Sequence, residues 1–439
     1  MRIFATILCL SFLPVSLYAP AQDVPTPTVD GYITAITSKT EFDVNGQHVI
    51  TTPKTEYIRR TITKQQETDT PDPSIANSLA LGKQVQVFGD KNGKHQIVAT
   101  QIFMHQRSGK EKAVTGFAVI QKVITGKPNL VVEADGYRMS IPSSATIQYQ
   151  APLTSASTVA PNWWISYTGK FGKDGLLVDN QATFSQFVFS APHMLKTMHD
   201  EEKFVPPDYA TKKNGTVNLG YGIKGTLPAD QKINERLRQI GERLIPTCQR
   251  DLESGNLQKI NFQFYAFDNK HIRAAVASQD GKILVPVQTV ARMQTDDQLS
   301  AVLANGIAQA LEWQPLRDVF SQSNQASAMM AVGGLPFIGP LAGIALESGG
   351  LYAAHHAQTS GQALEQQRAR VGLSLMHDAG YDVFQAPTAW QILMAKDVKK
   401  IGTKQMPQQS LYMWEILSKE YLPGSNAVIA SNKTNAGSK

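Results

Sequence analysis

A repeated pattern of short β-rich stretches is the feature that most constrains the fold of this 439-residue chain. VDGYITAI (29–36) resembles VTGFAVIQ (114–121), and each is followed by a second β-rich stretch, FDVNGQHVITT (42–52) or LVVEADGYRMSI (130–141). Later, VQVFGDKNGKHQIVATQI (85–102) resembles ISYTGKFGKDGLLVDNQA (165–182), so Gly31 corresponds to Gly116 and Gly89 to Gly169. A period of about eighty residues is too long for a solenoid and predicts two small β domains in tandem.

Turn residues indicate that each repeat forms a closed sheet. Asn92-Gly93 and Asp174-Gly175 lie between alternating strands, where a tight hairpin requires positive φ. Closure removes exposed sheet edges, so we expect OB-like barrels or similar closed sheets. The polar residues 60–79 predict a long loop inside the first repeat. In its glycine and turn placement, this half of the chain resembles the small β-barrel repeat domains of unknown function of exported bacterial proteins.

Three aromatic residues of the second repeat, Trp163, Trp164 and Tyr167, have two interpretations. They are either a stacking surface for nucleic-acid bases or aromatic core residues of a β domain. We favour the core. The formal net charge of +6 is mild and the basic residues are scattered, so nucleic acid is not an expected partner.

The first residues predict export. Met1-Arg2 is followed by a mostly apolar stretch to Ala19, and Ala19-Pro20-Ala21 fits a signal-peptidase site, so residues 1–21 are predicted to be a signal peptide. An uncleaved membrane anchor is the alternative. Cleavage removes Cys9 and leaves Cys248, which we expect to be a buried small apolar residue. We therefore expect a periplasmic or extracellular protein without an internal disulfide.

The remaining chain predicts a mainly helical α+β domain. Residues 24–107 and 108–189 are the two β repeats, 190–228 reads as a polar linker, 229–425 as the further domain, and 426–439 as a flexible tail. Asp230 is placed to cap a helix through Leu244, Ile260 begins an alternating strand, and residues 272–287 form strands around Asp280-Gly281. An amphipathic helix then follows over residues 300–312, with Thr295 or Asp296 as its N-cap.

This order of motifs resembles the HtpX- and BepA-type HExxH zinc metallopeptidases (peptidase family 48, metallo). The family helix "LxxVLAHExxH" corresponds to Leu299-Ser300-Ala301-Val302-Leu303-Ala304-Asn305-Gly306-Ile307-Ala308-Gln309. The family's ExxAD corresponds to Glu365-Gln366-Gln367-Arg368-Ala369, and its AGYD to Ala379-Gly380-Tyr381-Asp382. Over roughly residues 229–420, the resemblance implies a zincin-like fold and a zinc-dependent endopeptidase ancestry.

The residues at these positions are poorly suited to bind zinc or to act as the general base, in contrast to the corresponding residues of the family. Asn305 and Gln309 keep the i, i+4 spacing of the two zinc-binding histidines but offer neutral amides, which are poor zinc ligands. Gly306 cannot act as the general base that the family glutamate provides. Only Glu365, the family's third ligand, is retained. We expect no catalytic residue, no bound zinc and no other cofactor.

Two arrangements of the vestigial site remain open. In one, Glu365 forms a closed polar cluster with Asn305 and Gln309, with Arg368 supplying charge. In the other, Glu365 points to solvent. A rescued zinc site would use Glu365 with His355 or His356.

These observations predict a catalytically inactive, metallopeptidase-like exported protein that binds an envelope protein or peptide, or serves as a scaffold. A peptide partner is expected to add a strand against residues 282–287. The alternatives are an active zinc endopeptidase with non-standard ligands, and nucleic-acid or glycan binding through the β repeats. The uncharged stretch 328–346 is interrupted by Gly and Pro, which favours a packed hairpin or flap, with peripheral membrane contact as the alternative.

Overall fold

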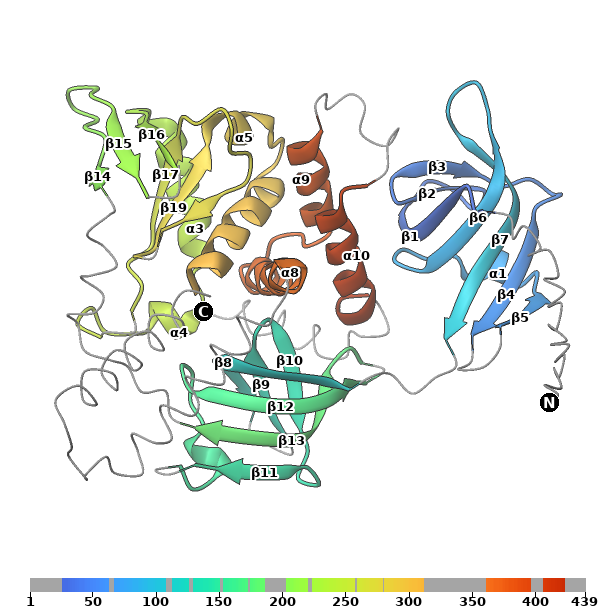
Figure 1. Cartoon of the computed structure of the whole chain (residues 1–439), viewed down its shortest axis with the longest axis horizontal. Coiled ribbons are helices and arrows are strands. Elements are labelled where there is room, and N and C mark those ends of the chain that lie inside the picture. The colour runs from blue at the N-terminus through green and yellow to red at the C-terminus, as the bar shows by residue number, and fades with distance from the viewer. Residues whose placement is uncertain are drawn as a thin grey trace, which may run out of the picture.

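The computed structural model describes residues 26–62, 67–107, 113–125, 129–150, 153–172, 174–185, 203–219, 223–256, 259–278, 280–311, 361–395 and 406–422. Two β-sheet units come first, followed by a region of α-helices and small sheets, so the chain is a multidomain α+β protein (Figure 1). The predicted signal peptide, the 328–346 stretch, His355, His356 and the C-terminal tail lie outside the described residues.

The first β unit has ring-like hydrogen bonding. Its elements are β1 (Val29–Ile36), β2 (Glu41–Val44), β3 (Gln47–Ile50), β4 (Glu56–Ile62), β5 (Glu67–Pro71), α1 (Ile75–Ser78), β6 (Gln84–Lys91) and β7 (Ile97–Arg107). Neighbouring strands pair in the order β1-β2-β3-β7-β6 and back to β1, with β3 and β7 parallel. Apolar side chains such as Ile33, Val87 and Ile102 fill the interior.

The second β unit repeats this topology. It contains β8 (Val114–Thr125), β9 (Leu130–Ala134), β10 (Tyr137–Ile141), β11 (Thr146–Tyr149), a 3₁₀ turn (Ala156–Thr158), β12 (Trp164–Phe171) and β13 (Leu177–Ser185). Its ring runs β8-β9-β10-β13-β12 and back to β8, with β10 and β13 parallel. Gly89 and Gly169 each lie at a register shift in equivalent strands. The predicted tandem repeat is therefore confirmed.

The turns of the β units differ in detail from the prediction. Gly175 has the expected positive φ, but in the Asn92-Gly93 hairpin the left-handed residue is His95, with φ 61°. The Asn92 side chain accepts the backbone N–H groups of Lys94 and Gln96, which moves the positive φ along the turn. Residues 60–79, predicted to be a loop, include the end of β4, together with β5 and α1.

Three short strands lie in the stretch that its composition predicted to be a linker. They are β14 (Lys203–Val205), β15 (Gly215–Asn218) and β16 (Lys224–Leu227), and they form one antiparallel sheet. Val217 and Leu227 are buried with Phe267 and Leu284, so this sheet packs on the helical region. The polar composition of the stretch hid these strands because β14 buries no side chain and β15 and β16 bury one each, Val217 and Leu227.

The helical region surrounds a three-stranded sheet. Its elements are α3 (Gln231–Leu244), α4 (Thr247–Arg250), β17 (Gln263–Phe267), β18 (Val276–Ala277), β19 (Lys282–Pro286), α5 (Val287–Arg292), an unlabelled helix over residues 296–311, α8 (Gly361–Asp378), α9 (Gln385–Met394) and α10 (Gln408–Glu420). The predicted caps are present: the Asp230 side chain accepts from Ile233 N, and the Thr295 hydroxyl accepts from Gln298 N. The predicted helix over 300–312 is confirmed within the described residues.

Both β units lie against the C-terminal helices (Figure 1). The first unit meets α10, and Tyr32 and Leu81 pack on the main apolar core. The second unit meets α8 through β10. Trp164 and Tyr167 are buried in the second unit and Trp163 packs against its core, which confirms the core interpretation of these aromatic residues. Cys248 is buried, as expected.

Candidate functional site

The helix over residues 296–311 lies tightly on the sheet at Gly306. A Cβ atom at this position would lie 2.7 Å from Ile283 Cγ2 and 3.2 Å from Ala275 Cβ. Real Cβ atoms are essentially never found at the shorter distance, so even an alanine requires Ile283 to move. The position that corresponds to the family's general base is therefore filled by the sheet's own side chains.

Gln309 is hydrogen-bonded to the backbone of β18. Its Oε1 accepts the Ala277 N–H at 3.1 Å. Ala277 pairs with Ile283, and the next residue, Ser278, donates its N–H to Lys282 O. Because hydrogen-bonded and non-hydrogen-bonded pairs alternate in an antiparallel ladder, the Ala277 N–H points away from β19. Gln309 therefore accepts the hydrogen bond of a backbone N–H that lies on the outer edge of β18.

Glu365 lies in a different environment. It is exposed on α8, and its Oε2 accepts from Gln409 Nε2 of α10 at 3.3 Å. Among the described residues, no hydrogen bond joins Glu365 to Asn305 or Gln309. Asn305 is half-buried, and a Cβ at Gly372 of α8 would lie 3.6 Å from its backbone nitrogen. The helices thus approach each other two turns away from Glu365, and the assignment of a vestigial site stays a prediction.

The other predicted site residues are placed as follows. Ala369, at the position of the family's aspartate, is buried in the main apolar core, and Arg368 is half-buried. In the described part of the chain, no three His, Cys, Asp or Glu side chains gather to hold a metal ion. No helix among the described residues is long and apolar enough to cross a membrane.

The expected strand addition to residues 282–287 is contradicted by the sheet order. β19 is the central strand, with β17 parallel on one side and β18 antiparallel on the other. β17 pairs with β19 along the whole length of β19, and β18 pairs with Ile283 and Leu284 on the other side, so an added strand would have to displace β18. The prediction failed because periodicity identifies a strand but does not show which strand is central.

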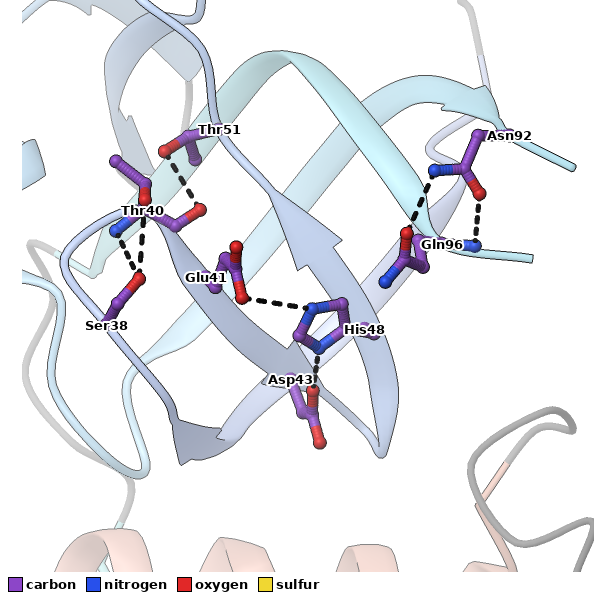
Figure 2. Close-up of polar contacts among 8 residues, drawn as sticks. All are labelled: Ser38, Thr40, Glu41, Asp43, His48, Thr51, Asn92 and Gln96. Atoms are coloured by element: carbon purple, nitrogen blue, oxygen red, sulfur yellow. Dashed lines mark hydrogen bonds and ion pairs between the residues drawn. The ribbon is translucent and has the colours of Figure 1, made fainter. Parts of the chain in front are cut away.

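A histidine on the first β unit lies between two carboxylates. Figure 2 shows His48 of β3 with Asp43 and Glu41 of β2 on opposite sides of its ring. His48 Nδ1 is 2.8 Å from Asp43 Oδ1, and Nε2 is 3.7 Å from Glu41 Oε2. The two carboxylates do not converge with one ring nitrogen on a common point. This arrangement braces the β2–β3 hairpin and is unsuited to chelating a metal.

A partly buried charged cluster joins the second β unit to α8, and sequence reasoning did not find it. Lys122, Glu133 and Arg138 stand in register on β8, β9 and β10. Ser374 of α8 donates its hydroxyl to Glu133 Oε1, and Lys122 Nζ lies 3.2 Å from Asp378 Oδ2. Arg138 Nη2 lies 2.7 Å from His377 Nδ1. The available signal was a glutamate within the apolar run LVVEA.

Glu133 is the deepest charged group of this cluster, with 3% of its surface exposed. Burial raises its pKa to about 7, and the neighbouring Asp378 carboxylate acts in the same direction. Burial also acts to raise the pKa of Asp378, but its contacts with His377 and Lys122 outweigh that effect and lower it. Near neutral pH the two acids therefore differ in protonation.

A second buried pair lies beside this cluster. Arg370 Nε of α8 is 3.3 Å from Glu420 Oε1 of α10, and the Arg370 guanidinium lies 3.8 Å from the ring centroid of Tyr137 on β10. Burial raises the pKa of Glu420, while the Arg370 charge opposes it. Gln367 of α8 donates to Asp135 in the β9–β10 turn. Charged and polar contacts thus fix the second β unit on α8.

Comparison with known proteins assigns only the first β unit. Residues 30–102 match the model of a family described as a domain of unknown function (DUF5666). This agrees with the expected resemblance to β domains of unknown function. No metallopeptidase family matches the chain. No curated protein matches the chain either.

Proposed function

We propose that this chain is an exported, non-catalytic binding or scaffold protein of the bacterial envelope. In this proposal, the β units are small barrels, and the region from residue 229 has a zincin-like fold without its reaction. The expected partner is an envelope protein or peptide. The observation that carries the proposal is the packing at Gly306, where Ile283 and Ala275 occupy the space that a general base would need.

The contacts of Gln309 support the same proposal. In a peptidase, a substrate in extended conformation needs free backbone groups on an edge strand. Here the Gln309 side chain already accepts the outward N–H of Ala277. A peptide that pairs with β18 must displace this side chain, so we expect productive substrate binding to be disfavoured.

The docking of both β units supports a scaffold role. The second unit is held on α8 by buried groups, including Glu133 with Ser374 and Arg370 with Tyr137. The first unit contacts α10 and the main core through Tyr32 and Leu81. A chain of rigidly docked domains can present separate surfaces to partners at fixed spacing.

Zinc analysis of the purified protein, together with a casein digestion assay, tests the proposal. We expect substoichiometric zinc and no cleavage that a chelator abolishes.

As a sharper test, the triple variant N305H/G306E/Q309H restores the family motif. We expect it to lose stability because of the collision at Ile283. The single variant Asn305→His, which leaves Gly306 in place, is the matched control. Stoichiometric zinc with chelator-sensitive cleavage by the wild-type protein would overturn the proposal.

A further inference from the structure

The two β units have equivalent outer strands, β4 and β11, but in the described part of the chain only β4 is paired on both edges. Each runs parallel to the last strand of its ring, with Glu56 opposite Gln101 and Thr146 opposite Gln181. On its other edge, β4 is covered by the antiparallel strand β5. Among the described residues, no strand pairs with the other edge of β11, which lies on the side of the second unit that faces away from the helical region (Figure 1).

The backbone groups on this open edge belong to Ile147 and Tyr149. Gln150 donates its N–H to Phe184 O of β13 at 2.9 Å. In a parallel pair, alternate residues direct both backbone groups to the neighbouring strand, so Gln148 also faces β13, whereas Ile147 and Tyr149 face outward. None of the described backbone hydrogen bonds outside the strand pairs uses either residue. The edge thus offers N–H and C=O groups in the alternation that an added strand requires.

The sequence of β11 lacks the residues that protect sheet edges from pairing. The exposed edge strand β5 of the first unit has the sequence ETDTP, whose charges and proline oppose pairing with another chain. By contrast, β11 has the sequence TIQY, and no charged residue stands between Arg138 and Lys170. Thr146 and Gln148 are exposed, so the surface beside the edge is polar and uncharged. Neither charge repulsion nor a missing backbone donor therefore opposes pairing with β11.

In one antiparallel register, β11 is complementary to itself. When Gln148 lies opposite Gln148 of a second copy, Ile147 lies opposite Tyr149 of that copy, and Tyr149 opposite its Ile147. These two pairs consist only of outward-facing residues, so each pair exchanges backbone hydrogen bonds, about four in all. Ile opposite an aromatic residue is also a favourable cross-strand pair. A shift by one residue would place an outward-facing residue opposite one that faces β13, and these bonds would be lost.

We propose that two copies of this chain associate through β11, antiparallel about a two-fold axis at Gln148, so that the sheets of their second β units join. A second copy is the expected occupant because the strand matches its own hydrogen-bonding register and carries no like charges at the contact. Strands of 4 residues bury little surface, so we expect a weak, reversible dimer with a dissociation constant of about 50 µM. This inference is independent of the proposed function, because it requires neither a lost reaction nor an envelope partner.

Sedimentation equilibrium of the full chain between about 5 and about 500 µM tests the inference. The wild type should change from mainly monomer to mainly dimer over this range. Hydrogen exchange resolved to single amides locates the contact: the amides of Ile147 and Tyr149 should exchange about fourfold more slowly at the higher concentration. The amides of Gln148 and Gln150 face β13 in the monomer already, so they should be unaffected and are the internal control.

Charge at the two-fold axis gives a sharper test. Gln148→Lys and Gln148→Glu each place like charges opposite each other, so each variant alone should dimerise at least about tenfold more weakly than the wild type. An equimolar mixture should recover dimerisation, because lysine then lies opposite glutamate. Only a residue on the axis meets its own copy, so this recovery is specific to the proposed register. Thr216→Lys, at an exposed position of β15, is the matched control and should dimerise as the wild type does.

Several results would overturn the inference. A wild type that stays monomeric at about 500 µM, tenfold above the expected constant, would leave the edge to another segment of the chain or to another protein. Dimerisation that Gln148→Lys does not weaken would place the contact on a different surface. Weakened variants whose mixture shows no recovery would exclude a two-fold axis at Gln148. Because Gln148 is exposed, both variants should fold, and circular dichroism of each separates loss of pairing from loss of structure.

Discussion

The two β units share one topology but attach to the rest of the molecule by different physical means. The first unit uses apolar contacts: Tyr32 and Leu81 pack on the main core, and Gly82 lies against Leu422. The second unit uses buried charges, among them Glu133 and the Arg370 guanidinium over Tyr137. A repeated fold therefore does not repeat its interface, because the strand pairing determines the ring and outward residues determine the docking.

The corresponding β-turns of the two units show the same contrast. Asn45-Gly46 in the first unit and Asp135-Gly136 in the second unit all have positive φ, as two-residue hairpins require. Asn45 folds back, with Oδ1 accepting from Tyr32 N and Nδ2 donating to Asp30 O. Asp135 instead accepts from Gln367 of α8. One turn closes on its own unit, and the other joins a neighbouring domain.

The largest expected effect on stability comes from breaking a buried ion pair of the second unit, compared with an exposed one of the first. Arg370→Ala leaves Glu420 buried without its partner and should lower the free energy of unfolding by about 3–5 kcal/mol. In the first unit, Asp69→Asn removes the exposed partner of Arg60 and should cost less than about 1 kcal/mol. Urea denaturation of both variants measures the difference. If both variants lose equally little, charge does not hold the second unit in place.

A buried aspartate distinguishes the interiors of the two rings. Asp179 opposes Gly169 in the second unit, where the first unit has Ala99 opposite Gly89. Burial raises the pKa of Asp179 to about 7, and neither carboxylate oxygen has a hydrogen-bond partner among the described residues. The native state thus binds a proton that the unfolded state releases above about pH 4, so this residue lowers stability as pH rises to about 7.

Asp179→Ala should therefore stabilise the protein by about 2–4 kcal/mol at pH 8. The gain should appear from about pH 4, level off above pH 7, and be small at pH 3.5. Denaturation of the variant and the wild type at each pH gives the difference in unfolding free energy. Glu133 titrates in the same range in both proteins, so its contribution cancels in that difference. The converse variant Ala99→Asp should destabilise at pH 8. A gain that does not depend on pH would contradict ionisation as the cause.

The next effect on stability comes from the close contact between the β9–β10 turn of the second unit and the backbone of α8. A Cβ at Gly136 would lie 2.7 Å from the α8 backbone at Arg370 and Val371, and its φ is +71°. Gly136→Ala should cost about 3 kcal/mol, since strain and collision add, and should expose the interface to protease. Gly380→Ala, with φ +78° and open space around it, is the matched control and should cost about 1 kcal/mol. Equal losses of stability in the two variants would show that α8 can shift to accommodate a side chain at position 136 at little cost.

The smallest expected effect on stability comes from giving the first unit's turn the residue found in the second unit's turn. Asn45→Asp copies the residue of the second unit into the first and removes the amide that donates to Asp30 O at 2.9 Å. A carboxylate cannot donate, so the variant should lose about 1–2 kcal/mol at pH 7, and less at pH 3, where a protonated acid can donate. Thermal denaturation of the variant at both pH values checks this. An unchanged midpoint would mean that Asn45 only provides the turn.

The fold was largely predictable because its signals are local. Gly89 and Gly169 aligned two repeats, and Asp230 and Thr295 marked helix starts that the structure contains. The short strands β14 to β16 were missed because few of their residues are apolar. The candidate site was less predictable. Two arrangements were open for Glu365, a cluster with Asn305 and Gln309 or a position facing solvent. In the structure Glu365 is exposed and its described partner is Gln409, because a helix brings only one face to each neighbour.

The sequence by itself determined the tandem β units, the helix over residues 300–311 and the absence of imidazole or carboxylate at positions 305, 306 and 309. Tertiary structure alone decided that Gln309 covers the Ala277 N–H, and that Glu133 meets Ser374, 241 residues away in the chain. The reason is physical: alternation and turn residues act over a few neighbours, whereas burial of a charge depends on which surfaces dock.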